Sequence, residues 1–163
     1  MKFEIRDTFP VSPEVLFESL IDAEIETRLA SMAQAEREVL EEREEGDVLF
    51  RRLRYTSGNP AFSQLARLLG SDKVTYEQHL RIHRPTQRVA WEMIPPAAAD
   101  RLKAEGAFWV VSHAEGSERL VEGNVTVKIP LVGGTLEGRV VDAIKKIYSK
   151  GTQFRREYLA ARG

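Results

Sequence analysis

The sequence contains no cysteine, and its acidic and basic residues are nearly equal in number. Without cysteine, the chain can form no disulfide, thiolate nucleophile or cysteine-based zinc site. The net charge of −1 is far from the strongly positive charge that binding to a phosphate backbone requires. No segment approaches the roughly 20 consecutive apolar residues of a membrane span, and the alternating N-terminus lacks the apolar run of a signal peptide. We therefore expect a cytoplasmic protein that has no membrane span and binds no nucleic acid.

The 163 residues are 42% hydrophobic and 30% charged, which is typical of a globular domain. We therefore expect residues 1–163 to form a single domain. Charged and apolar residues alternate over residues 2–9, which predicts a half-buried strand. Ser12 can cap a helix that has Pro13 in its first turn, and a second short helix is expected over residues 23–32. The chain therefore begins with one strand and two short helices.

A period of two between apolar residues predicts further strands after the two helices. We expect these strands over residues 37–43, 48–55, 73–83, 88–94, 107–114 and 119–129. Two segments interrupt the run: a short apolar helix over residues 61–69 and a Pro/Ala-rich connection over residues 95–106. Binding residues often lie on such connections, so the two segments are either mobile parts at the mouth of a site or ordinary loops.

Apolar side chains near the C-terminus recur at three- and four-residue spacing. They are Leu136, Val140, Ile144, Ile147, Tyr148, Phe154 and Tyr158. This stripe predicts one amphipathic helix over residues 134–161. A large sheet must cover its apolar face, and a helix only about 10 Å wide is too narrow to fill a strongly curved one. The order of elements therefore predicts an α+β fold with an elongated, largely apolar cavity between sheet and helix.

Two stretches of the sequence resemble a known superfamily. The first is the opening, residues 2–17, which begins KFEI and ends LF; the second is residues 125–137, VTVKIPLVGGTLE. On these stretches the chain resembles START-like proteins, the polyketide cyclase and lipid-transfer superfamily, and within it an uncharacterised bacterial family. The resemblance implies the helix-grip fold, a curved antiparallel sheet of about six to seven strands around the long C-terminal helix. It also implies binding of a lipid, a sterol-like molecule or a polyketide, and it transfers no catalytic residue.

The strand phases and the helical stripe together predict the wall of the cavity. From the strands we expect Tyr76, Gln78, Leu80, Val89, Trp91, Met93, Trp109, Val111 and His113, and from the helix Ile144, Ile147, Tyr148 and Phe154. Gln78 could hydrogen-bond a ligand or a neighbouring buried group. For each of the aromatic side chains, ordinary core packing is the alternative explanation.

His113 and Asp7 are the candidates for catalysis. His113 shares a phase with Trp109 and Val111, so it could be a general acid or base in the cavity, or a rim histidine. His79 and His83 are four residues apart in a strand, about 13 Å, which is too far for them to share a metal ion. We therefore expect no metal site and no cofactor.

Asp7 is in phase with the apolar residues of the first strand, and a carboxylate there is costly to bury without a partner. We expect an arginine partner, with Arg51, Arg52 and Arg54 as the candidates. Such a pair could be a structural salt bridge or a clamp for a ligand.

Three functions are compatible with these observations. The first is binding or carriage of a hydrophobic small molecule, by a monomer or a homodimer. The second is a cyclase- or dehydratase-type enzyme that uses histidine, aspartate and tyrosine groups of the pocket, which would require at least two of them to converge. The third is a protein-interaction module whose cavity is filled by Trp91, Met93 and Trp109. The sequence favours the first function and a chain that is not an enzyme.

Overall fold

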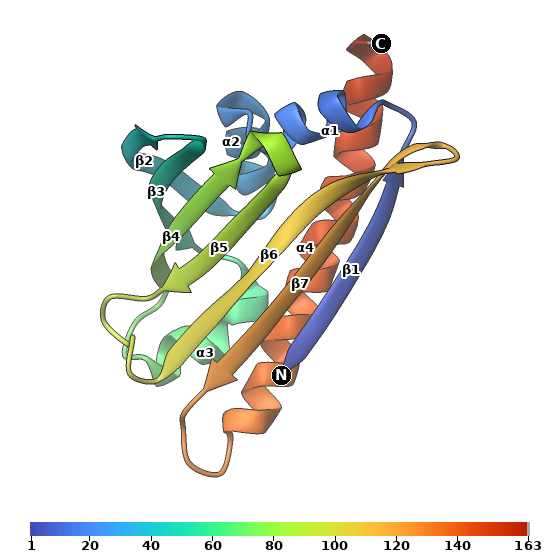
Figure 1. Ribbon diagram of the computed structural model, residues 1–163. Coiled ribbons are helices and arrows are strands. Elements are labelled where there is room, and N and C mark those ends of the chain that lie inside the picture. The colour runs from blue at the N-terminus through green and yellow to red at the C-terminus, as the bar shows by residue number, and fades with distance from the viewer. Residues whose placement is uncertain (163) are drawn as a thin grey trace.

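The computed structural model describes residues 1–162; Gly163, the last residue of the expected domain, lies outside them. One antiparallel sheet has the strand order β1-β7-β6-β5-β4-β3-β2. Its strands are β1 (Lys2–Phe9), β2 (Ala35–Glu45), β3 (Val48–Ser57), β4 (Val74–His83), β5 (Arg88–Ile94), β6 (Leu102–His113) and β7 (Gly116–Val127). The long helix α4 (Gly133–Arg162) crosses one face of this curved sheet, as Figure 1 shows. The expected α+β helix-grip architecture is therefore confirmed.

Two short helices, α1 (Pro13–Leu20) and α2 (Ala23–Met32), follow β1 and lie beside α4 at one end of the sheet (Figure 1). Each begins where the sequence provides a cap. The Ser12 hydroxyl accepts a hydrogen bond from the Val15 N–H, and the Asp22 carboxylate accepts one from the Ile25 N–H. These caps satisfy N–H groups that a helix leaves without a partner. They fix the boundary between two helices that point in different directions.

The connections differ in detail from the expectation. The single apolar helix expected over residues 61–69 is a short 3-10 turn, η1 (Pro60–Phe62), followed by α3 (Ser63–Leu68). A second 3-10 turn, η2 (Arg84–Thr86), joins β4 to β5. The expected connection over residues 95–106 is too long, because β6 already begins at Leu102 and pairs with β7 as far as Val127.

The apolar interior consists of two clusters of buried side chains. The first, the β7–α4 core, includes Val121, Val125, Leu136 and Val140. The second, the α1–β4 core, includes Phe9, Leu16, Phe17, Leu80 and Ile82. Trp91 and Phe108 pack against both clusters, yet both remain only half-buried. The interior is therefore not one continuous core, and the side chains between its two parts keep accessible surface.

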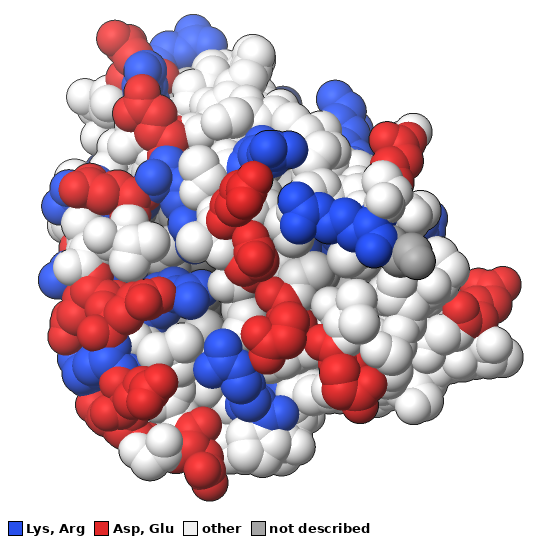
Figure 2. All heavy atoms as spheres, turned by 90° about the horizontal axis from the view of Figure 1, so that it is seen from above, with Lys and Arg blue, Asp and Glu red and all other residues white. Residues whose placement is uncertain are grey.

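Charges of both signs cover the surface. In the view of Figure 2, acidic and basic side chains are interspersed, and neither forms a broad field of one sign. Within residues 1–162, no helix combines the length and the low polarity that crossing a membrane would demand.

Candidate functional site

Trp91 lies between the sheet and α4, where it packs against the β7–α4 core. It lies in register with Gly106 of β6, which in turn lies in register with Gly123 of β7. A Cβ atom on either glycine would come within 2.8 Å of the Trp91 ring, so only glycine lets the indole lie on the sheet backbone. The indole N–H is buried and has no acceptor within residues 1–162. Because such a donor costs about 1–3 kcal/mol, a ligand oxygen that met it would be stabilising.

Three tyrosines surround the same space. Tyr55 of β3 and Tyr76 of β4 are register partners, and their rings stack with centroids 5.3 Å apart. Tyr148 comes from α4, on the opposite side of the space, and all three side chains are half-buried. The Tyr55 hydroxyl accepts a hydrogen bond of 3.2 Å from Arg37 Nε. The Tyr76 and Tyr148 hydroxyls make no hydrogen bond within residues 1–162, so they can donate to a ligand.

Burial keeps these phenols neutral. Burial and the nearby Glu26 carboxylate, against the opposing effect of Arg37, raise the pKa of Tyr55 to about 12. Burial is also the main reason why the pKa values of Tyr76 and Tyr148 are raised. A phenol with a raised pKa donates hydrogen bonds at neutral pH and is a poor general base there. The three tyrosines are therefore suited to binding polar groups and not to removing protons.

The raised pKa values predict a loss of stability at alkaline pH. The folded state holds the Tyr55 proton more tightly than the unfolded state, whose pKa is near 10. This contribution to stability is complete below pH 10 and is lost as the pH rises towards about 12. We expect the urea midpoint to fall over this range, and to fall less steeply in Tyr55→Phe. An equally steep fall in both proteins would show that Tyr55 does not contribute.

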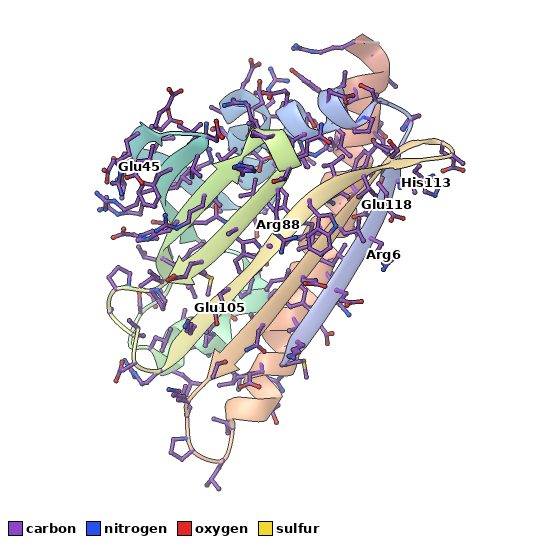
Figure 3. All side chains as sticks on the ribbon, in the orientation of Figure 1. Arg6, Glu45, Arg88, Glu105, His113 and Glu118 are labelled. Atoms are coloured by element: carbon purple, nitrogen blue, oxygen red, sulfur yellow. The ribbon has the colours of Figure 1, made fainter. Side chains whose placement is uncertain are left out.

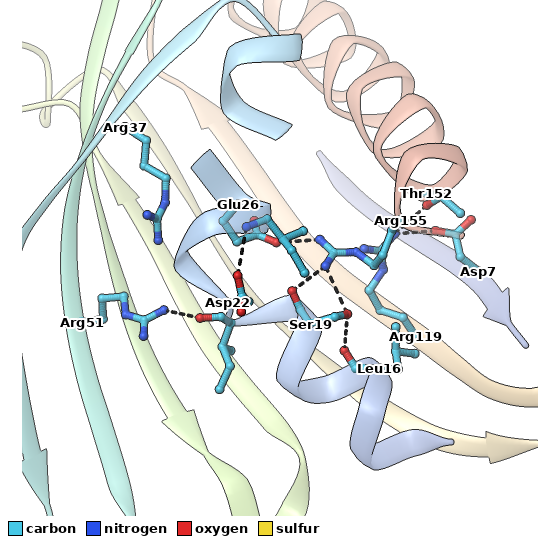
Figure 4. A network of polar contacts seen from close by, with 12 residues as sticks. Asp7, Leu16, Ser19, Asp22, Glu26, Arg37, Arg51, Arg119, Thr152 and Arg155 are labelled. Atoms are coloured by element: carbon cyan, nitrogen blue, oxygen red, sulfur yellow. Dashed lines mark hydrogen bonds and ion pairs between the residues drawn. The ribbon is translucent and has the colours of Figure 1, made fainter. Parts of the chain in front are cut away.

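Two buried arginines hold the upper end of the space together (Figure 4). Arg119 of β7 donates hydrogen bonds of 2.8 Å to Asp7 Oδ2 and to Thr152 Oγ1, and its guanidinium lies 4.9 Å from the centre of the Tyr148 ring. Arg155 of α4 donates to the Ser19 carbonyl and to Glu26 Oε1, each at 2.6 Å. Since each cation has a carboxylate partner, the network ties α4 to β1, α1 and α2.

Most of the predicted wall residues lie on the side of the sheet that faces α4. The half-buried side chains of Tyr76, Trp91, Met93, Ile144 and Tyr148 pack against the β7–α4 core, and Leu80 and Val89 are buried in the α1–β4 core. Gln78 is in register with Met93 and shares this face. Ile147 and Phe154 are half-buried but belong to neither cluster.

The predicted inward positions of Trp109, Val111 and His113 are wrong. Their register places these alternate residues on the convex face, opposite to Phe108 and Val110. Arg88 covers the Trp109 ring at 4.6 Å, and Val111 is 40% exposed. The error arises from the apolar run from Ala107 to Val111. Because every residue in this run is apolar, the sequence does not show which side chains point inward and which point outward.

His113 is therefore remote from the interior. It is exposed at the β6–β7 hairpin, as Figure 3 shows, and its Nδ1 accepts a hydrogen bond from the Glu115 N–H at 3.1 Å. Asp7 lies on β1, on the face of the sheet towards α4, and is paired with Arg119. The two candidate catalytic residues do not converge.

The partner of Asp7 also differs from the expectation. None of Arg51, Arg52 and Arg54 pairs with it; the partner is Arg119, its register neighbour on β7. Arg51 does face inward, where it donates to Glu42 and to the Ile21 carbonyl. Arg52 and Arg54 bind Glu77 and Glu38 at the other face. Strand order decides this pairing, and strand order is not visible in the spacing of one chain.

Several residues of the site were absent from the sequence-based prediction: Glu26, Arg37, Tyr55, Phe108, Arg119, Thr152 and Arg155. A signal existed for Arg155, which lies two turns after Tyr148 and therefore on the same face of the helix. No comparable signal existed for Glu26, because its position depends on how α2 packs against α4.

The surface within residues 1–162 is hollowed in at least two places. One surrounds the loop from Val127 to Gly134. Another lies between Phe50, His79, Glu92 and Glu105 and also reaches Trp91 and Gly106. In the same part of the chain, no three histidine or carboxylate side chains are placed to hold a metal ion. The interior between the sheet and α4 is lined by half-buried side chains.

Comparisons with known proteins agree with this architecture. The family described as "Protein of unknown function (DUF2505)" matches residues 4–159. No curated protein matches the chain.

Several solved structures have the same fold. TTHA0849 from Thermus thermophilus is 20% identical over 100% of both chains, with a TM-score of 0.70. A START superfamily protein from Mycobacterium smegmatis is 15% identical over 98% of this chain and 97% of its own, with a TM-score of 0.64. The di-domain ARO/CYC protein BexL from the BE-7585A biosynthetic pathway is 11% identical over 96% of this chain and 49% of its own, with a TM-score of 0.66. At these identities the likeness is one of fold. The chain belongs to the DUF2505 family, and its fold is the helix-grip fold of the START-like superfamily.

Proposed function

We propose that this protein binds a hydrophobic small molecule between α4 and the sheet, and that residues 1–163 act as one binding domain. The observation that carries the proposal is the set of half-buried aromatic side chains that separates the two cores. Trp91, Tyr76 and Tyr148 pack against the same core, and the buried Trp91 indole N–H has no partner within residues 1–162. Apolar walls with a few polar groups that fix orientation are typical of ligand sites.

A ligand between α4 and the sheet would meet the half-buried side chains between the two cores. Such half-buried residues can move outward at less cost than the fully buried ones. The structural neighbours include a START superfamily protein and an ARO/CYC protein of a biosynthetic pathway. For this chain a non-catalytic role is the better supported one, because His113 and Asp7 are apart and the tyrosines are held neutral.

Nile red, an uncharged fluorescent dye, provides a direct test. We expect saturable binding to the wild-type protein, and about ten-fold weaker binding to Ile144→Phe, since the larger side chain occupies the space beside Tyr148. The matched control is Lys145→Phe, which adds the same ring on the exposed face of the same helix turn and should leave binding unchanged. Native mass spectrometry of the purified protein should also detect a co-purified apolar molecule. Equal binding by both variants, or no saturable binding at all, would refute the proposal.

A further inference from the structure

Four arginines point from the sheet or α4 towards the interior, and one of them lacks a counter-ion. Arg51 pairs with Glu42, Arg119 with Asp7 and Arg155 with Glu26, at 2.6, 2.8 and 2.6 Å. Arg37 of β2 is the register partner of Tyr55 and shares its face. Its two hydrogen bonds, to the Tyr55 hydroxyl at 3.2 Å and to Thr27 Oγ1 at 3.3 Å, both go to neutral oxygens. Within residues 1–162 it makes no ion pair, although its side chain is half-buried.

The charged groups around Arg37 leave its charge uncompensated. Glu26 of α2 is the acid that faces this side of the space, and Arg155 already neutralises it. On β2 itself, the neighbouring acid Glu38 points to the other face and pairs with Arg54. On α2, Glu24 pairs with Arg28 at the exposed surface. The local balance is therefore one positive charge in excess, at the edge of a half-buried space.

Neutral donors stand next to this cation. The Tyr55 hydroxyl accepts from Arg37, so its own proton remains available for a further hydrogen bond. The Tyr76 ring is stacked on Tyr55, and its hydroxyl has no partner within residues 1–162. Arg37 contacts Tyr55, and Tyr55 stacks on Tyr76, so one guanidinium and two phenol O–H groups are available as neighbouring donors. Hydrogen bonds in which the donor or the acceptor is ionised are about twice as strong as those between neutral groups, so an anion would gain from all three donors.

We propose that Arg37, together with Tyr55 and Tyr76, binds the anionic group of an amphipathic ligand whose apolar part lies on Trp91. This inference rests on the proposed function and specifies its ligand class as an apolar molecule that carries a carboxylate or a similar anion. Leu80, the register partner of Trp91, is four residues beyond Tyr76 on β4, a distance of about 13 Å along the strand. A ligand that reaches both points has its charge at one end and an apolar body of at least about 10 Å.

Dodecanoate and dodecanol test the proposal as matched probes, because they differ in the carboxylate alone. Each is titrated into the protein loaded with Nile red, and the displacement of the dye gives its affinity. We expect Arg37→Gln to weaken dodecanoate binding about ten-fold, the loss expected for a charge-assisted hydrogen bond, and to change dodecanol binding by less than two-fold. Arg37→Lys, which keeps the charge, should lose less than Arg37→Gln. Arg54→Gln removes a cation of β3 that points to the other face and should leave both probes unaffected.

The outcomes separate this inference from the proposed function. If neither Nile red nor dodecanol binds the wild-type protein, the proposed function itself fails. If dodecanol displaces the dye from all variants, but dodecanoate binds Arg37→Gln as tightly as the wild type, the anion site is refuted and the apolar site stands. Dodecanol reports on the integrity of each variant, so equal losses for both probes would assign Arg37 a structural role and would also overturn the inference.

Discussion

Replacing Arg155 by methionine should lower the free energy of unfolding by about 3 kcal/mol. The guanidinium is 3% exposed and donates to the Ser19 carbonyl, to the Ser19 hydroxyl and to Glu26. Methionine has a similar length and no donor, so these acceptors would be left without their partner while the packing volume is largely kept. Removing one member of a buried pair costs more than the pair contributes, because the remaining charge stays in a poorly solvated place.

The matched control is Arg28→Met. Arg28 pairs with Glu24 on the exposed face of α2, and such a pair contributes at most about 0.5 kcal/mol. Urea unfolding of the three proteins measures both effects. If Arg155→Met were as stable as Arg28→Met, the contacts of Arg155 with α1 and α2 would not hold the long helix in place.

Replacing Gly106 by alanine should cost about 3 kcal/mol, near the upper end of what overpacking a core costs. The new Cβ atom would lie 2.8 Å from the Trp91 ring and closer still to the Glu122 carbonyl oxygen on β7. The ring could tilt away, but the β7 backbone is held by pairing on both sides and cannot. We therefore expect the substitution to separate β6 from β7 locally and to displace Trp91.

Gly134→Ala is the control for this change, since nothing lies within 4 Å of a Cβ atom at Gly134, which is in the first turn of α4. Alanine has the higher helix propensity, so this variant should be as stable as the wild type or slightly more stable. Thermal unfolding and the emission spectrum of Trp91, read in a Trp109→Phe background, check both variants. An unchanged Trp91 spectrum in Gly106→Ala would contradict the close contact between the indole and the sheet.

The elements with strong periodic signals could be predicted closely from the sequence. The long helix was expected over residues 134–161 and extends over Gly133–Arg162, and α2 has the expected bounds. α2 begins at a capping residue and α4 has an apolar stripe, and each is a signal that a local sequence pattern can show. β6 was placed too late, because Gly106 within the Pro/Ala-rich segment resembled a loop residue. In the fold this glycine is inside a strand, where it makes room for Trp91.

The residues of the candidate site also form two groups, those that a local sequence pattern predicts and those that it does not. Inward residues of β4, β5 and α4, such as Tyr76, Met93 and Tyr148, followed from clean alternation or helical spacing. The buried arginines did not, because a charged side chain in isolation is expected to face solvent. Arg119 and Arg155 are inside because Asp7 and Glu26 come from other elements to meet them. Such pairing depends on strand order and helix packing, which one sequence does not display.

Methionine-methyl NMR tests most directly whether the ligand binds between α4 and the sheet. The chain has three methionines. Met93 faces the interior, whereas Met1 and Met32 are 48% and 54% exposed. Met1 lies beside the start of α4, so it also reports on the neighbouring surface. On titration with dodecanol, the Met93 signal should shift and saturate while the signals of Met1 and Met32 stay in place. Shifts at Met1 or Met32 with an unmoved Met93 signal would place binding on the outer surface and contradict the account.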